Sequence, residues 1–410
     1  MKRTKVISSV TLMVFAFLAL IAAINVANPT ANPKWSPLNA TELQFPLLRG
    51  SSTSVYTGPT PTYSNSSILF AGFLSDEHAG QPRLNDVWKL TNANGKGGTA
   101  TWSNLIPNGA AGSPPIRSNH SAVYDAAHNR MIIYGGCGSP LQVPPSCQPI
   151  ANDVWVLSNA DGTTGTPTWT QLFPNGGPPP ARQAHQAVYD PTTNSMIVWA
   201  GQNGALGENC ATYSDVWVLS NANGLPPGTQ NWTQLSPTGG PPAGQYHSTA
   251  VYDSSNNVMT VFGGVGMVGT TCQTTNAVWA LSHANGIGTP VWSNLVAQDA
   301  TGSPANRGNH GAVYLPSSNT MTIFGGINGC CGNPTMNLGD TWVLSHANGL
   351  GGTPVWTQLN INGPVASSRY NNVGIDTVNH LMIMGGGGTS GGIHDGPLWG
   401  SWVLSHPNGP

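Results

Sequence analysis

Arginine recurs at one position of a long repeat, and this regularity is the first sign of chemistry in the chain. Five residues occupy the position: Arg49, Arg117, Arg182, Arg307 and, displaced by one residue, Arg369. The guanidinium group is a planar fork of hydrogen-bond donors that suits carboxylates and oxygen-rich ligands. One interpretation is therefore a ring of ligand-binding arginines that recognises an anion or a polyol.

An internal ion pair is the second interpretation. Aspartates occupy another repeat position, two residues before a tryptophan: Asp86, Asp153, Asp215 and Asp340. The copy with Gln245 instead of arginine also has Ala277 instead of aspartate, and the copy with the displaced Arg369 has Ser401. Because the two charges are lost together, arginine–aspartate bridges are favoured for most of the set. Arg369 then keeps the ligand-binding interpretation most strongly.

Histidines form a second recurring set: His120, His185, His247 and His310, replaced in the other copies by Ser52 and Asn371. Imidazoles on neighbouring segments are potential metal ligands. A histidine repeated once per copy is more often a packing residue, and a ring this wide separates its members by more than a metal shell allows. We therefore predict no metal site and no cofactor.

A glycine-rich run over residues 385–392 is followed by three further ligand-binding candidates, His394, Asp395 and Trp399. No two of the acidic residues outside the repeat positions form a recognisable general acid and base pair. We therefore predict no catalytic residue. The alternative is a sugar-active enzyme that uses the arginines together with Asp395, His394 or Glu208.

Short strands must position these residues. The stretch from Arg182 to Leu235 contains four strand-like pieces, and the same pieces recur with a period of roughly 60 to 68 residues. Twelve of the 14 tryptophans fall in the third and fourth pieces, so the repeat is regular along the whole chain. Four strands per period are the signature of a β-propeller, in which each repeat is one blade. We predict an all-β propeller with six blades of four antiparallel strands, in which the first, innermost strand of each blade is a nearly continuous apolar run that forms the buried wall of the channel.

The ring needs a closing strand, because the sixth repeat stops after its third piece. A copy of the fourth piece, Trp35–Leu38, lies near the other end of the sequence. Pairing this segment with the last blade removes the free edges that an open ring exposes. We predict closure by this N-terminal strand.

The pattern resembles the Kelch repeat, which has an arginine before the innermost strand, a double glycine after the second and aromatic residues in the third and fourth. The double glycine is present at residues 135–136, 263–264, 325–326 and 385–386, whereas Ala71-Gly72 and Ala200-Gly201 depart from it. The resemblance covers about residues 35–406 and implies a six-bladed propeller. It leaves function open, since Kelch-type proteins include binding modules, copper radical oxidases similar to galactose oxidase, and sialic-acid epimerases.

The two faces of such a propeller differ in this sequence. Turns between strands one and two, and between strands three and four, are uniform and rich in Asn, Asp and Gly, which suit tight turns. Loops between strands two and three vary in length and composition. We call these the regular face and the irregular face, and we predict that the irregular face binds a glycan or protein ligand.

The cysteines all lie in loops of the irregular face: Cys137, Cys147, Cys210, Cys272, Cys330 and Cys331. Cys137 with Cys147 is the simplest local bridge. Cys210 and Cys272 each precede a third-strand tryptophan by seven residues, so neighbouring blades can bring them together. Cys330 and Cys331 are candidates for a vicinal disulfide, for bridges to other loops, or for free thiols.

Composition and the N-terminus indicate an exported protein. Residues 1–27 place Lys2, Arg3 and Lys5 before a long apolar run, which is the order of a cleaved signal peptide or an uncleaved membrane anchor. Residues 28–34 are a linker, and residues 35–410 are the propeller. An even number of cysteines fits an oxidising compartment. The net charge of −2 gives no reason to expect nucleic acid as a partner.

Overall fold

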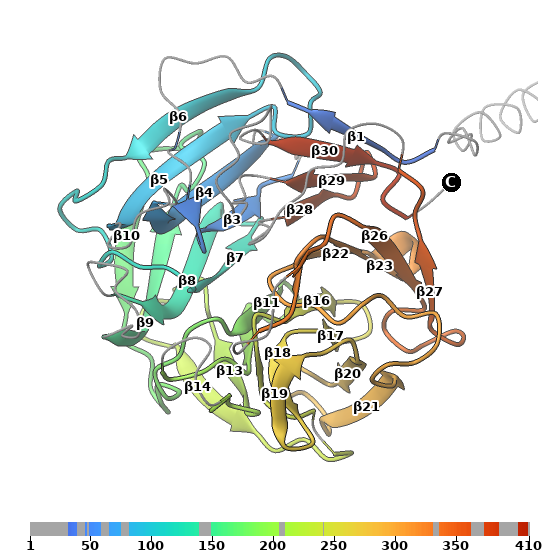
Figure 1. The fold of residues 1–410 in the computed structure, drawn as a ribbon. Helices are drawn as coiled ribbons and strands as arrows, with labels where there is room; N and C mark the ends of the chain where they lie inside the picture. The colour runs from blue at the N-terminus through green and yellow to red at the C-terminus, as the bar shows by residue number, and fades with distance from the viewer. Residues whose placement is uncertain are drawn as a thin grey trace, which may run out of the picture.

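The computed structural model describes residues 32–38, 46, 49–58, 65–74, 82–138, 149–204, 210–240, 242–330, 336–361, 373–384 and 401–408. These residues form β-strands and one 3-10 turn, η1 (Pro316–Ser318). Figure 1 shows sheets arranged around a central axis, as predicted for an all-β propeller. None of the described segments is a helix with the length and apolar character needed to cross a membrane.

Six sheets form the blades. Blade one contains β2 (Arg49–Gly50), β3 (Thr53–Tyr56), β4 (Ser66–Leu74), β5 (Arg83–Thr91) and β6 (Thr101–Ile106). Blade two contains β7 (Ser121–Asp125), β8 (Arg130–Cys137), β9 (Ile150–Ser158) and β10 (Thr168–Leu172). Blade three contains β11 (Gln186–Asp190), β12 (Ser195–Trp199), β13 (Val216–Ser220) and β14 (Asn231–Leu235).

The remaining blades follow the same order. Blade four contains β16 (Thr249–Asp253), β17 (Val258–Phe262), β20 (Val278–Ser282) and β21 (Val291–Val296). Blade five contains β22 (Gly311–Leu315), β23 (Thr320–Phe324), β26 (Thr341–Ser345) and β27 (Val355–Gln358). Blade six contains β28 (Val373–Asp376), β29 (Leu381–Met384), β30 (Trp402–Ser405) and β1 (Lys34–Pro37).

Burial differs between the first and second strands of a blade. β12, β17 and β23 are buried at every residue, whereas β7 and β16 alternate between buried and half-buried residues. The prediction that the innermost strand is a nearly continuous buried run was therefore wrong. One face of that strand lines the central channel, while the second strand is covered by neighbouring blades on both sides.

The N-terminal strand lies in the last blade. β1 pairs antiparallel with β30, with Trp35 opposite Leu404, and the Leu38 amide continues the pairing by donating to the Ser401 carbonyl at 2.8 Å. The innermost strand of blade six, β28, also contacts β3 of blade one, so the first and last blades are neighbours (Figure 1). The Asn94 amide of blade one donates to the Asp376 carboxylate of blade six at 2.7 Å across this seam.

The fourth-strand tryptophans pack each blade onto the one before it. Five of the indoles lie against an aromatic ring in the second strand of the preceding blade, with ring centroids 4.7 to 5.9 Å apart. The pairs are Trp169–Phe70, Trp232–Tyr134, Trp292–Trp199, Trp356–Phe262 and Trp35–Phe324. This contact gives the repeated tryptophan its role, since tilted aromatic pairs add to the apolar area that each interface buries.

The regular face joins neighbouring blades with polar side chains. An asparagine in the loop between strands three and four donates to an aspartate at the end of the first strand of the preceding blade, at 2.7 or 2.8 Å. The pairs are Asn223–Asp125, Asn285–Asp190, Asn348–Asp253 and Asn94–Asp376. The uniformity of this face is therefore structural, because each turn must fit its neighbour.

Candidate functional site

The described arginines of the repeat are engaged in ion pairs inside the blades. Arg182 donates from both terminal nitrogens to the two carboxylate oxygens of Asp215, at 2.7 and 2.8 Å. The same two-pronged geometry joins Arg49 to Asp86, Arg117 to Asp153 and Arg307 to Asp340. All four arginine side chains are at most 4% exposed. The structure therefore shows the internal ion pair at these positions, and a ligand has no access to these guanidinium groups.

Each bridge also fixes the strand ends around it. Arg182 donates to the Ala200 carbonyl at 2.9 Å, and the indole of Trp217 donates to Asp215 at 2.7 Å. Burial alone would raise the pKa of Asp215, but hydrogen bonds and charge from Arg182 hold it below its usual value. Blade four, which lacks both charges, replaces the bridge with a bond from the Gln245 amide to Thr275 at 3.0 Å.

Three histidines of the repeat are packing residues between blades. Each imidazole Nε2 lies 2.6 to 2.8 Å from a hydroxyl of the preceding blade, in the pairs His120–Thr53, His185–Ser121 and His310–Thr249. Each ring also lies edge-on to the aromatic residue of the preceding blade, with centroids 5.1 Å apart. These contacts agree with the packing interpretation of the set. Among the described residues, no cluster of three or more potential ligands could hold a metal ion.

His247 does not belong to this set. The sequence places it two residues after Gln245, whereas His120 and His185 each follow their arginine by three. Ser248 takes the packing position in blade four. In the preceding blade, Trp199 stands at the position that Phe70, Tyr134 or Phe262 has in the other blades. The prediction of one four-membered histidine ring was therefore wrong.

His247 instead belongs to a belt of backbone hydrogen bonds at the channel mouth. Among the described residues, four hydrogen bonds of 2.8 to 3.0 Å each run from the N–H of a belt residue to the carbonyl of the equivalent residue in the preceding blade. The series runs from Ser51 through Asn119, Ala184 and His247 to Asn309. All five have a left-handed backbone, with φ between 51° and 55°. This conformation is uncommon for residues other than glycine, so the belt fixes five side chains in unusual directions.

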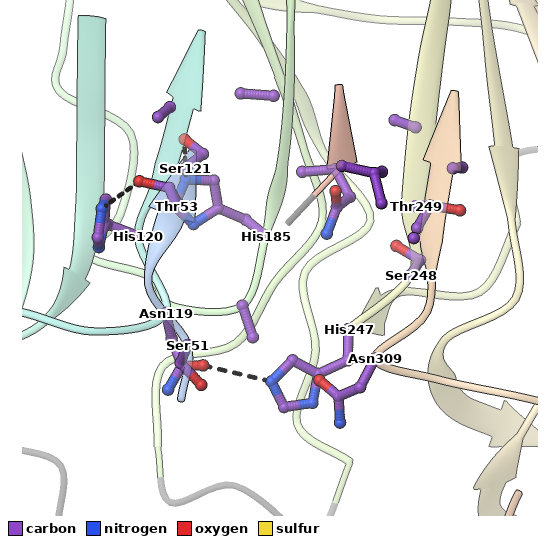
Figure 2. A pocket seen from close by; sticks show the side chains of 18 of the residues that line it. Ser51, Thr53, Asn119, His120, Ser121, His185, His247, Ser248, Thr249 and Asn309 are labelled. Atoms are coloured by element: carbon purple, nitrogen blue, oxygen red, sulfur yellow. Dashed lines mark hydrogen bonds between the residues drawn. The ribbon is translucent and has the colours of Figure 1, made fainter. Parts of the chain in front are cut away.

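A cavity of about 220 Å³ begins at this belt and follows the channel. Its mouth is formed by the belt side chains, and its wall by hydroxyl groups and small residues of the innermost strands, among them Thr53, Ser121, Thr249 and Ala122. Figure 2 shows Ser51, Asn119, His247 and Asn309 grouped at one end of the cavity. His247 Nε2 lies 3.4 Å from Asn119 Oδ1, a contact between blades four and two that narrows the opening (Figure 2).

The ionisable groups on the cavity wall are uncharged. Burial and the nearby Arg182 charge lower the pKa of His185 to about 3, and burial lowers that of His247 to about 4. The pKa values of His120 and His310 also lie well below the usual value, again chiefly because of burial. Their Nδ1 atoms, like that of His185, are buried without a hydrogen-bond partner among the described residues, so a second ring proton would be unpaired.

A ridge stands beside the mouth on the irregular face of blades three to five. It comprises β15 (Gln245–Tyr246), β18 (Val265–Val268), β19 (Thr271–Thr274), β24 (Ile327–Asn328), β25 (Met336–Asn337) and Cys210. Cys210 of blade three and Cys272 of blade four form a disulfide, with Cα atoms 5.7 Å apart, which is one of the pairings that the sequence left open. Within the ridge, Tyr246 and Val265 are buried and pack together with Cys210 and the belt residue Ala184.

The other cysteines are described only in part. Cys137 is disulfide-bonded, and its predicted partner Cys147 lies outside the described residues. Cys330 Sγ lies 3.8 Å from the Cys272 carbonyl oxygen, so the blade-five part of the ridge contacts the blade-four part next to the disulfide. Cys331 lies outside the described residues.

Several predicted site residues fall in the same category. Arg369, His394, Asp395 and Trp399 lie outside the described residues, as does Glu208. They remain predictions. The belt and the ridge were not predicted, because neither follows the repeat at the level of residue type.

The comparisons with known proteins agree with this architecture. Residues 145–387, more than half of the chain, match the profile described as the KLHDC2/KLHL20/DRC7 Kelch-repeats domain. The chain belongs to the Kelch-repeat family. Solved structures with a fold similar to that of this chain include two of low sequence identity. One, titled "Structure of YjhT", has a TM-score of 0.58 and 15% identity over 90% of this chain and 95% of that one.

The second similar structure is a chain of a cryo-EM structure of RAG in complex with one melted and one unmelted RSS. The TM-score is 0.54 and the identity 12%, over 90% of this Kelch chain and 99% of that one. Identities this low indicate a shared fold, and one fold hosts many activities.

Proposed function

We propose that the protein is an exported binding module that recognises a glycan or protein partner through its irregular face, without catalysis. The observation that carries the proposal is the ridge. Strands two and three of blades one, two and four extend outward past the rest of the blade, and the Cys210–Cys272 disulfide joins this region of blade four to blade three. A cross-link between blades at the outer end of variable loops is best explained by recognition.

The ridge presents side chains suited to contact with a partner. Met267 on β18 is 38% exposed, and Met336 on β25 is 58% exposed. Methionine side chains are flexible and polarisable, and they are common on surfaces that adapt to a partner. The buried Tyr246 and the Cys210–Cys272 disulfide hold the backbone beneath them in place.

The charges of the scaffold support a role without catalysis. The four described repeat arginines are paired, and four aspartates of the regular face accept hydrogen bonds from the next blade. These groups are therefore committed to structure. The alternative, a sugar-active enzyme, depends on His394, Asp395 or Glu208, outside the described residues.

The test compares variants on the two faces. Met267→Asp and Met336→Asp introduce charge on the ridge, and Ile287→Asp and Leu350→Asp do the same at exposed apolar residues of the regular face, which are 63% and 48% exposed. Glycan arrays and displayed protein libraries are probed with each. We expect binding to be lost only in the ridge variants. Equal loss on both faces, or turnover of a bound sugar, would overturn the proposal.

Export is tested separately. Residues 1–34 are fused to a reporter that is active only outside the cytoplasm, with Lys2, Arg3 and Lys5 changed to glutamate in the control. We expect the native segment alone to deliver the reporter, because positive charge before the apolar run directs export.

A further inference from the structure

The cavity at the channel mouth is a site without formal charge. The described residues that line it include hydroxyl, amide and small apolar side chains and four histidines, but no Asp, Glu, Lys or Arg. Burial keeps the histidines neutral at physiological pH. The nearest arginines are neutralised by their aspartates. A charged ligand would lose its hydration here and gain no opposite charge in return.

The same wall offers polar groups that the fold leaves unused. The Oγ atom of Ser248 is buried without a hydrogen-bond partner among the described residues, and Ser248 is 3% exposed. Figure 2 shows Ser248 on the wall close to His247. At the mouth, the long contact of 3.4 Å between His247 and Asn119 is weak enough to be exchanged for a ligand.

The belt holds these groups in position before a ligand arrives. The backbones of Asn119, His247 and Asn309 are fixed by hydrogen bonds to the preceding blades. Their side chains therefore meet at the mouth without an ordering cost on binding, which is the usual advantage of a preformed site. Since amides, hydroxyls and a neutral imidazole both donate and accept, the site matches a ligand whose groups do the same.

We propose that this cavity binds a small, uncharged polyol, the terminal unit of a neutral sugar, through Asn119, His247, Asn309 and Ser248. The inference rests on the proposed function and names the ligand class at one place on the irregular face. The volume of about 220 Å³ is below the ~300 Å³ at which pockets for drug-sized ligands begin, so one sugar unit fits better than a longer ligand.

The left-handed belt provides a matched pair of variants. Asn309→Gly removes an amide but keeps a residue that readily adopts positive φ, whereas Ala184→Gly makes the same backbone change and removes no polar group. Ser248→Ala tests the buried hydroxyl. The full chain is titrated with glucose, galactose, mannose and N-acetylglucosamine to roughly 20 mM and followed by ligand-observed NMR. Glucuronate and galacturonate serve as charged counterparts of the same rings.

We expect at least one neutral sugar to bind and its carboxylate counterpart to bind about tenfold more weakly. Asn309→Gly and Ser248→Ala should weaken binding by about fivefold to tenfold, as expected for one lost hydrogen bond, and Ala184→Gly should leave it unchanged. Binding of the uronates at equal strength, equal effects of Asn309→Gly and Ala184→Gly, or no binding by any neutral sugar would overturn the inference. The ridge variant Met267→Asp separates the two proposals. If Met267→Asp abolishes partner binding while no sugar binds, only the cavity inference is wrong. If sugars bind but the ridge variants have no effect on partner binding, only the proposal of partner binding at the ridge is wrong.

Discussion

Arg182 and Asp215 are joined by two parallel hydrogen bonds of 2.7 and 2.8 Å inside blade three, and neither terminal nitrogen of the arginine faces solvent. Removing one partner leaves the other charge buried and unpaired, which costs about 3 to 5 kcal/mol. We expect Arg182→Gln and Asp215→Ala each to lower the free energy of unfolding by an amount near this range, measured by urea denaturation.

The double variant gives the sharper result. Arg182→Gln with Asp215→Ala reproduces the residues that blade four carries naturally, Gln245 and Ala277. Because no charge is then left unpaired, we expect its loss of stability to fall short of the sum of the single losses by about 1 to 3 kcal/mol. Simple additivity would mean that the two side chains do not depend on each other.

The buried His185 predicts a loss of stability in mild acid. Its pKa falls to about 3 in the folded protein, mainly because of burial, whereas the unfolded chain has the ordinary value of about 6.5. The unfolded state therefore binds the proton first, and stability is full above pH 6.5 and lost as pH falls toward 3. We expect His185→Gln to reduce the slope of unfolding free energy between pH 6.5 and 5 by up to about 1.4 kcal/mol per pH unit. An unchanged slope would show that this histidine is not buried as a neutral ring.

The adjacent residues Ala200 and Gly201 should differ in how well they tolerate substitution by each other's residue type. A Cβ on Gly201 would lie 2.6 Å from the His185 Cβ, and φ there is 90°. We expect Gly201→Ala to cost about 2 to 5 kcal/mol, because of overpacking and backbone strain together. Ala200→Gly should change stability by no more than about 1 kcal/mol, since residue 200 already has positive φ. Thermal unfolding of the two variants distinguishes them.

Reduction of the Cys210–Cys272 disulfide should lower the local stability of the ridge and leave that of the blade sheets unchanged. The bond joins loops of blades three and four outside the blade sheets, and the interblade aromatic contacts are independent of it. Amide hydrogen exchange with and without reductant is the measurement. We expect faster exchange over residues 265–274 and unchanged exchange in β12 and β17. Faster exchange in β12 or β17 would show that the disulfide stabilises the propeller itself.

Features that recur from blade to blade as the same residue type could be predicted from the sequence. The Arg182–Asp215 pairing was favoured by the joint loss of both charges in blade four, and equal spacing to a tryptophan made Cys210–Cys272 one of the possible bonds. The pairing of Trp35 with β30 followed from a fourth-strand piece at the other end of the chain. In each case chemistry and spacing point to the same partner.

Features set by the backbone could not be predicted in this way. The belt places Ser51, Asn119, Ala184, His247 and Asn309 in one conformation, although these side chains have nothing in common. Only Asn119 and Asn309 hint at a left-handed backbone. His247 was assigned to the wrong set because residue type was given more weight than its distance from Gln245. In three pairs, a packing histidine is matched by a serine or threonine in the preceding blade. Requiring this match in the sequence would have excluded His247 from the set of packing histidines.

The contacts between blades also differ from one junction to the next. A histidine faces a hydroxyl at three junctions, whereas at the junction of blades three and four Ser248 has the histidine position and Trp199 the aromatic position of the repeat. A blade paired with the wrong neighbour would leave an imidazole without its acceptor or force two large rings into one space. During folding, such mismatched intermediates are less stable than the native order. The junction of blades three and four is thereby distinguished from the three junctions that use a histidine, which limits the orders in which the blades can pair.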